Sequence, residues 1–231
     1  MKTRNQLTSE EKYNQMSLKY KSVSLEKMKE NAFSTFDLQG WRNFLIDKVV
    51  NLSPNYLLDL GGGLGDKMFR FYSCSGTNSD IKIVDFAEQP MEIRSFLASL
   101  NINLIKADVF DFLNKKKSLL YDVVIMFGFL HEIKDTNSLI DKVSKIIDRK
   151  GILILSDNTL HKNADDLAGE FKASFKFVSV YKSKSYFKSI HKFDSDDCSV
   201  SKAFWKFHRG RVDDLLIIAS HKKICKNFLE R

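Results

Sequence analysis

One stretch, residues 55–66, constrains the fold of this chain more than any other. Its sequence is NYLLDLGGGLGD, in which a short apolar run leads to Asp59 and a glycine-rich turn follows: Gly61, Gly62, Gly63 and Gly65. An apolar strand, a glycine-rich turn and then an amphipathic helix form the opening of a nucleotide-binding βα unit. Glycine permits positive φ and lets the backbone approach a ligand, which the N–H groups of the helix start then face. The stretch therefore predicts a ligand-binding loop.

The composition indicates one ordered α/β core. The chain has 231 residues, of which 43% are hydrophobic, and no apolar run approaches the length of a membrane span. The first fifteen residues are polar and lack the apolar segment of a secretory signal. Cys74, Cys198 and Cys225 are widely spaced, without metal-like pairing. We therefore expect a cytoplasmic protein with free thiols and no membrane association.

The positive charge is concentrated near the C-terminus. The net charge is +8, and residues 181–231 contain twelve Lys or Arg against six Asp or Glu. Such a region could attract an anionic substrate, RNA or a membrane surface. A solvated, lysine-rich face also accounts for it, and no nucleic-acid-binding signature accompanies the charge.

Residues 8–52 predict three helices. Thr8 to Glu11 form an N-cap with first-turn acids, a second helix covers residues 25–32, and a third, with a wide apolar face, covers residues 39–51. The Ser53-Pro54 pair ends the third helix. We therefore divide the chain into a helical cap or lid, residues 1–52, and a Rossmann-like domain, residues 53–231, within a single structural domain overall.

After residue 54 the pattern alternates between strands and helices. Predicted strands occupy residues 56–58, 81–84, 102–106, 121–127 and 152–155, and predicted helices occupy residues 67–74, 89–100, 109–114 and 137–147. This order predicts an open parallel sheet with helices on both faces. Arg149-Lys150-Gly151 is interpreted as the turn before the last of these strands.

The C-terminal part departs from this alternation. Residues 175–181 and 214–220 have strand patterns without the spacing of a further βαβ unit. We therefore expect a mostly parallel sheet that finishes on an antiparallel strand pair. Residues 182–211 are too many for a hairpin loop, and we expect them near the substrate entrance.

Acidic residues follow the apolar runs repeatedly. Asp59, Asp85, Asp108 and Asp157 each stand at or just past the end of a predicted strand, and Gly128 to Glu132 follow another. In an open α/β sheet, ligands bind at the carboxyl ends of the strands near the topological switch point. These residues are therefore expected to gather around one ligand.

Over residues 56–158 these motifs resemble the class I S-adenosylmethionine-dependent methyltransferases. The family's D-x-G-x-G-x-G loop is present at residues 59–65, YDVVIMFGFLHEI matches its fourth-strand motif, and LIDKVSKIIDRKGILILSDN resembles its helix, glycine turn and fifth strand. The resemblance implies that Asp85 holds the ribose hydroxyls and that Asp108, in ADVFDF, contacts the adenine amino group. The cofactor-binding residues implied are Asp59, Gly61, Gly62, Gly63, Gly65, Asp85, Phe86, Asp108, Val109, Phe127, Gly128 and Tyr20.

The glycine spacing also bears on other cofactors. A dinucleotide oxidoreductase usually seats a pyrophosphate on G-x-G-x-x-G, whereas the glycines here alternate, and Asp59 directly precedes the turn. An acid at this place suits the amino group of a methionine moiety, so binding of NAD is the lesser interpretation. A role for Asp59 in capping the turn is compatible with both.

His131 and Glu132 are the candidate catalytic residues. In GFLHEIKD they follow the fourth predicted strand, and a histidine there could remove a proton from a substrate hydroxyl during methyl transfer. The segment resembles the H-D-W-x-D segment of small-molecule O-methyltransferases, in which the histidine is the base. Glu132 stands in place of Asp and Ile133 in place of Trp. A histidine that only lines the cofactor site is the alternative.

Asp157-Asn158 raises the question of a metal. Metal-dependent O-methyltransferases have an Asp-Asn pair after the fifth strand and an Asp that ends the fourth, and these ligands suit Mg²⁺. In this chain Phe127 occupies the fourth-strand position, so a ligand is missing. We expect no metal, and interpret the pair as a polar strand end.

Two flanking segments could close the site. The N-terminal helices resemble the lid of many small methyltransferases, and Tyr13 or Tyr20 could contact the cofactor from it, although aromatic residues on a helix often only pack. Residues 181–193, YKSKSYFKSIHKF, could contact an anionic substrate or form a solvated edge strand.

The sequence therefore predicts a methyltransferase that uses S-adenosylmethionine to methylate a small-molecule acceptor, with an oxygen as the expected atom. Methylation of RNA or protein through the basic C-terminal region is the alternative activity. A third possibility is a cofactor-binding fold that serves as a non-catalytic interaction partner. Nothing in the sequence indicates the oligomeric state.

Overall fold

The computed structural model describes residues 9–35, 37–76, 78–115, 119–157, 164–186, 190–193 and 215–223. Its helices are α1 (Ser9–Lys21), α2 (Leu25–Phe33), α3 (Asp37–Val50), α4 (Asp66–Ser75), α5 (Met91–Ser99), α6 (Val109–Lys115), the 3₁₀ turn η2 (Leu130–Glu132), α7 (Thr136–Ser144) and α8 (Ala164–Ser174). Its strands are β1 (Tyr56–Leu60), β2 (Asp80–Asp85), β3 (Ile102–Lys106), β4 (Tyr121–Phe127), β5 (Ile147–Asp157), β6 (Phe177–Tyr186), β7 (Ile190–Phe193) and β8 (Leu215–Ser220).

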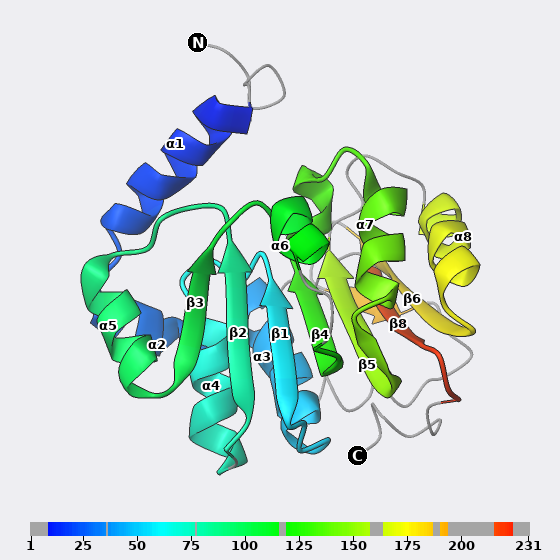
Figure 1. Ribbon diagram of the computed structural model, residues 1–231, viewed down its shortest axis with the longest axis horizontal. Coiled ribbons are helices and arrows are strands. Elements are labelled where there is room, and N and C mark those ends of the chain that lie inside the picture. The colour runs from blue at the N-terminus through cyan, green and yellow to red at the C-terminus, as the bar shows by residue number, and fades with distance from the viewer. Residues whose placement is uncertain are drawn as a thin grey trace.

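The described strands form one sheet, in the order β3-β2-β1-β4-β5-β8-β6-β7 (Figure 1). The first five strands in this order pair in parallel, and β8 joins them antiparallel to β5. The chain starts in the middle of the sheet at β1, proceeds outward to β3 and returns to the other side of β1 as β4. The prediction of a mostly parallel, Rossmann-like sheet with antiparallel C-terminal strands is confirmed, and the topological switch point lies between β1 and β4.

Two hydrophobic layers hold helices to the sheet, one on each face (Figure 1). Successive residues of β1 point to opposite faces, so Leu57 packs behind the sheet with α2 to α5, whereas Leu58 packs in front with α6 to α8. Trp41 and Phe71 are among the fully buried side chains of the rear layer. Each such burial contributes roughly 1.5–3 kcal/mol or more.

The predicted turn at Arg149-Lys150-Gly151 is wrong, because β5 continues through these residues. The pairing of β4 with β5 shifts register between Tyr121 and Val123, which places an irregularity beside the glycine. A Cβ at Gly151 would lie 2.6 Å from the backbone oxygen of Tyr121. The glycine therefore marks a close approach of two strands and not a chain reversal.

The C-terminal part contains more regular structure than the sequence suggested. β6 extends to Tyr186 and pairs with β7, so residues 182–186 and 190–193 belong to strands. This agrees with the edge-strand interpretation of residues 181–193, and residues 194–214 lie outside the described part. Helix α8 had no counterpart among the sequence predictions.

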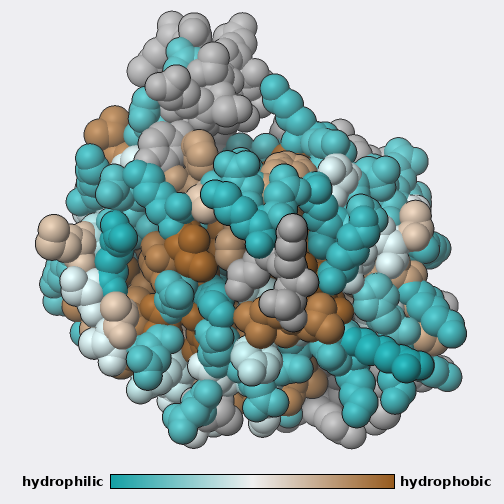
Figure 2. Space-filling model, in the orientation of Figure 1, coloured by the Kyte–Doolittle hydropathy of each residue, from teal (hydrophilic) through white to brown (hydrophobic). Residues whose placement is uncertain are grey.

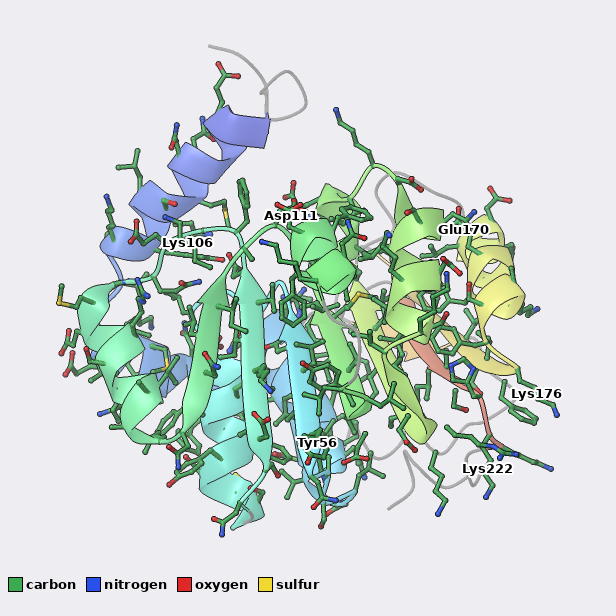
Figure 3. The ribbon with its side chains drawn as sticks, viewed as in Figure 1. Tyr56, Lys106, Asp111, Glu170, Lys176 and Lys222 are labelled. Atoms are coloured by element: carbon green, nitrogen blue, oxygen red, sulfur yellow. The ribbon has the colours of Figure 1, made fainter. Side chains whose placement is uncertain are left out.

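The carboxyl ends of the parallel strands meet at one edge of the molecule. In Figure 3, Tyr56 lies where β1 begins, at the lower edge, whereas Lys106 lies where β3 ends and Asp111 lies on α6, both near the upper edge. Figure 2 shows the same face as largely hydrophilic, with hydrophobic surface between α5 and α6. The upper edge is where a ligand of this fold is expected.

Helix α1 reaches toward this edge from the N-terminal side (Figure 1). The side chain of Ser17 is buried, and its Oγ accepts a hydrogen bond of 3.3 Å from the backbone N–H of Glu88, just beyond β2. Among the described helices, none has the length and apolar character needed to cross a membrane.

Candidate functional site

The glycine loop between β1 and α4 is fixed by backbone hydrogen bonds to β2. Gly61 (φ 73°) donates its N–H to the backbone oxygen of Val84 at 2.8 Å, and Gly63 (φ 57°) donates to Oδ2 of Asp85 at 2.8 Å. Gly65 (φ 82°) precedes the first turn of α4. Positive φ at three positions is the conformation for which glycine is suited, so the turn predicted from the sequence is present.

The loop is also tightly surrounded. A Cβ at Gly61 would meet the ring of Phe129, and one at Gly62 would meet the carboxylate of Asp59. A Cβ at Gly65 would lie 2.7 Å from a methyl group of Leu97. These glycines therefore let the segment after β4, strand β1 and helix α5 approach the loop, in addition to shaping its backbone.

Asp59 is a buried carboxylate with an unpartnered oxygen. It is 1% exposed, and its Oδ2 has no hydrogen-bond partner. Burial raises the pKa of Asp59 to about 8, although the positive charge of Lys67 opposes that shift. A buried polar atom without a partner is costly, and a cationic group placed here would supply one. The site thus fits the ammonium end of a methionine moiety.

Asp85 is held between two backbone donors. Its Oδ2 accepts from the N–H of Gly63 and its Oδ1 accepts from the N–H of Ala87, both at 2.8 Å. Burial raises the pKa of Asp85, while these two hydrogen bonds act in the opposite direction. The carboxylate therefore lies at the end of β2 with a fixed orientation, beside the glycine loop. Its predicted role is to hold the ribose hydroxyls of the cofactor.

Tyr20 of α1 lies directly over the loop. A Cβ at Gly63 would come within 3.0 Å of its Oη. Burial raises the pKa of Tyr20, and the negative charges of Asp85, Asp66 and Asp59 raise it further. The phenol is therefore neutral at physiological pH and surrounded by acids. The side chain of Tyr13 lies outside the described part.

The other predicted cofactor residues occupy different environments. Asp108 caps α6, its Oδ1 accepting from the N–H of Phe110 at 2.8 Å. Phe86 is 47% exposed just beyond β2. Val109 and Phe127 are buried in the two hydrophobic layers.

His131 lies in η2, between two carboxylates. Its Nδ1 is 2.8 Å from Oδ1 of Asp157, its Nε2 is 3.2 Å from Oε1 of Glu132, and its backbone N–H donates to Oδ2 of Asp157 at 3.1 Å. The side chain of Asp157 is 3% exposed, whereas those of His131 and Glu132 are 21% and 29% exposed. Asp157 thus forms hydrogen bonds with both the imidazole ring and the backbone N–H of His131.

These carboxylates change the acidity of the imidazole. The hydrogen bond to Asp157 is the largest cause, that to Glu132 the next, and together they raise the pKa of His131 to about 9 in spite of its burial. The ring therefore carries a proton at neutral pH in this arrangement. Loss of that proton gives a stronger base than an ordinary histidine.

Three contributors to the site were not predicted from the sequence. Asp157 was predicted to lie at a strand end near the ligand and was considered as a metal ligand, but its hydrogen bond to His131 was not predicted. Gln89 donates from Nε2 to the backbone oxygen of Gly63 at 2.9 Å, which ties the loop to the start of α5. Arg42 of α3 lies against Gly128, at the end of β4. The two residues of each pair are 26 to 86 positions apart in the sequence, so no local sequence pattern indicated these contacts.

No cluster of three metal-binding side chains occurs among the residues that the structure describes. Asn158, the second member of the Asp-Asn pair, lies outside them. A hollow of about 920 Å³ lies along α5 and β3, lined by residues such as Arg94, Ser95 and Asn103, and contains none of the predicted site residues.

The sequence matches a known family over most of its length. Residues 53–209 match the model of a family described as a methyltransferase domain. No curated protein sequence matches the chain at a significant level.

Solved structures with similar folds are also methyltransferases. The precorrin-6y C5,15-methyltransferase of Geobacter metallireducens is 18% identical, with a TM-score of 0.53, over 80% of this chain and 88% of that one. A plantazolicin methyltransferase, solved with a pentazolic analogue and S-adenosylhomocysteine, is 12% identical, with a TM-score of 0.57, over 92% and 99%. The 1,6-didemethyltoxoflavin-N1-methyltransferase of Burkholderia thailandensis is 14% identical, with a TM-score of 0.53, over 78% and 76%. At these identities the similarity supports the fold alone.

Proposed function

This chain belongs to the methyltransferase domain family and is an S-adenosylmethionine-dependent methyltransferase. On that premise we propose that it methylates a small-molecule acceptor at an oxygen. The observation that carries the proposal is the His131–Asp157 pair, since a histidine held by a buried carboxylate is suited to take a proton from a hydroxyl.

The cofactor end of the site would be formed by the loop and the acids around it. We propose that Asp59 faces the ammonium group of the methionine moiety, that Asp85 holds the ribose hydroxyls, and that Asp108 with Val109 binds the adenine. Phe86 and Tyr20 would pack on the ligand, and Phe127 and Gly128 would contact it through their backbone. The bound cofactor supplies an electrophilic methyl group.

His131 would act on the acceptor from the other side of the cleft. Its Nδ1 is engaged by Asp157, so Nε2 is the nitrogen that would accept the hydroxyl proton, after it has released to solvent the proton that it carries at neutral pH. Because Glu132 contacts Nε2 at 3.2 Å, an acceptor would reach this atom in place of Glu132. Proximity and orientation within the cleft would supply much of the remaining acceleration.

Residues 1–52 would serve as a helical cap on a single structural domain. The contact of Tyr20 with the loop and the hydrogen bond between Ser17 and Glu88 support this proposal, because both bring α1 to the carboxyl ends of the strands. Residues 53–231 would contain the cofactor site.

Radiolabelled methyl transfer tests the proposal. The protein is incubated with S-adenosylmethionine labelled on its methyl group and with separate small-molecule, RNA and protein fractions of a cell extract. Label is expected in the small-molecule fraction, in a base-stable ether linkage. His131→Ala should lower the rate about 10²- to 10⁴-fold while cofactor affinity changes little.

The other outcomes discriminate between the alternatives. Label in RNA, with binding that falls steeply as salt rises, would support the role of the basic C-terminal region instead. Cofactor binding without any transfer to the three fractions would favour a non-catalytic role. Transfer that is indifferent to His131→Ala would remove the base from the mechanism.

A further inference from the structure

The hollow along α5 and the outer edge of β3, here called the β3 groove, lies apart from the cofactor and acceptor residues. It is lined by Lys21 and by residues between 88 and 104, and its volume of about 920 Å³ is that of a ligand site. We propose that the β3 groove binds an extended, acidic segment of a partner protein, which adds a strand to the sheet.

Strand β3 is the outermost strand on one side of the described sheet (Figure 1). Among the described strands it pairs with β2 alone. The N–H of Ala107, just after β3, is donated to the backbone oxygen of Asp85 in β2 at 3.0 Å. Because successive residues direct their backbone groups to opposite sides, Ile102, Leu104 and Lys106 direct theirs away from β2. Such an edge is a template for pairing with another chain.

Helix α5 supplies the second wall of the β3 groove. Its lining residues are all exposed and recur at the spacing of one helical face: Met91, Arg94, Ser95 and Ala98. Ile93 and Leu97 are buried and attach the helix to the layer behind the sheet. A strand added to β3 would therefore direct alternate side chains toward an open helix face.

The β3 groove carries an excess of positive charge. Lys21 and Arg94 are the cations among its described lining residues, and Glu88 is the acid. The carboxylate of Glu88 lies 3.7 Å from Nη1 of Arg94 and 3.2 Å from Nζ of Lys106, so one acid is shared by two cations. All of these side chains are substantially exposed. An acidic segment would supply the missing negative charge and is thereby selected over a basic one.

Gln89 gives the β3 groove a buried acceptor as well. It lines the hollow and is 3% exposed, and its Oε1 has no hydrogen-bond partner among the described residues. Its Nε2 is engaged, because it donates to the backbone oxygen of Gly63 at 2.9 Å. A donor on the bound segment would satisfy the remaining oxygen.

These features favour an extended peptide over two other occupants. A second copy pairing through its own β3 would bring Lys106 and no acid, because the sequence of β3 is INLIK. A small anion would match the charge but would leave the outward backbone groups of β3 without partners.

NMR titration of the isotope-labelled protein tests this surface. The probe is a blocked peptide, slightly longer than β3, in which glutamate alternates with valine. One matched peptide has lysine in place of glutamate, and another is methylated on all of its backbone nitrogens. We expect the acidic peptide to shift the amide signals of Ile102, Leu104 and Lys106 saturably. The lysine peptide should bind about 10-fold more weakly, and the methylated peptide should cause no saturable shift.

Arg94→Glu should weaken binding of the acidic peptide about 10-fold. Lys145→Glu is the matched control, because it makes the same change of charge at an exposed residue that ends α7, and it should bind as the wild type does.

Three results would overturn the proposal. The first is the absence of any saturable shift at β3. The second is equal binding of the acidic and methylated peptides, which would indicate a site for anions and not strand addition. The third is a shift of the same amides with protein concentration alone, which would indicate that a second copy occupies the β3 groove.

Discussion

Three aspartates at the carboxyl edge of the sheet differ in what surrounds them, and each environment suits a different task. Asp59 is buried with an unpartnered oxygen, Asp85 is oriented by two N–H donors, and Asp157 is bonded to His131. A buried acid without a partner favours a cationic ligand, whereas an acid with fixed oxygens favours recognition of hydroxyl groups. The same residue type can therefore serve the cofactor and the acceptor.

Asp85→Ala is expected to weaken binding of S-adenosylmethionine about 10- to 100-fold. It removes the acceptor for the N–H groups of Gly63 and Ala87, so the loop loses its orientation together with the predicted ribose contact. Asp141→Ala is a suitable control, because Asp141 is an exposed residue of α7 paired with Lys145. Calorimetric titration of both variants measures the difference, and equal affinities would contradict the role of Asp85.

The titration of His131 should depend on Asp157. The pKa of His131 is raised to about 9, so its protonated form stabilises the fold fully below about pH 6.5, the ordinary value for histidine. This contribution is lost as the pH rises from there through about 9. NMR titration of the imidazole should give a midpoint near 9 in the wild type and a clearly lower one in Asp157→Asn. An unchanged midpoint in Asp157→Asn would show that Asp157 does not determine the pKa of the His131 imidazole.

For the individual helices, strands and loops, the sequence predicted the features that depend on residues close together in the chain. The glycine loop, the acids that end β1 and β2, and the parallel strands follow from hydrophobic runs and punctuating residues. Gly151 was misinterpreted as a turn because a glycine required by a close approach of strands looks the same in sequence. For residues 181–193 the sequence left two interpretations open, contact with an anionic substrate or an edge strand, because edge strands can be polar. The pairing of β6 with β7 agrees with the edge strand.

The contacts that complete the site could not be obtained in this way. Asp157 meets His131 across 26 residues, and Arg42 meets Gly128 across 86, because β5 and α3 converge on the end of β4 only in the folded chain. Asp157 did carry a signal, since it ends a strand beside the predicted base. Arg42 carried none, because one charged residue on an amphipathic helix is ordinarily solvated.

The contact between α1 and the loop can be tested with two matched glycines. Gly63 and Gly76 have φ of 57° and 60°, so alanine costs a similar backbone strain of about 1–2 kcal/mol at each. A Cβ at Gly63 would lie 3.0 Å from Oη of Tyr20, whereas one at Gly76 would meet nothing within 4 Å. Both variants should unfold at lower urea concentrations, but only Gly63→Ala should also lose affinity for S-adenosylmethionine. Equal affinities of the two variants for S-adenosylmethionine would mean that the loop tolerates a methyl group at residue 63 and that the side chain of Tyr20 moves away from it.

Across the whole molecule, the N-terminal helices α2 and α3 are part of the core and not an attachment to it. Trp41 is fully buried behind the sheet and bonds Ser156 of β5, 115 residues away. Arg70 of α4 likewise donates to the backbone oxygen of Ala32 in α2 at 2.9 Å. These contacts join segments from both halves of the chain.

Trp41→Phe should lower the free energy of unfolding by about 1–3 kcal/mol. The substitution keeps an aromatic ring but removes the donor to Ser156 and part of the buried volume. Urea denaturation followed by circular dichroism should report a single transition at a lower midpoint. Two separate transitions would contradict the single structural domain proposed for residues 1–231.

Calorimetric titration of the intact protein tests most directly whether the carboxyl edge of this sheet binds S-adenosylmethionine. We predict saturable binding with one site per chain, together with an unfolding free energy that rises by about 2.7 kcal/mol at a ligand concentration of 100 Kd. Absence of detectable heat and of any stabilisation by S-adenosylmethionine, in a protein that is folded by circular dichroism, would contradict it.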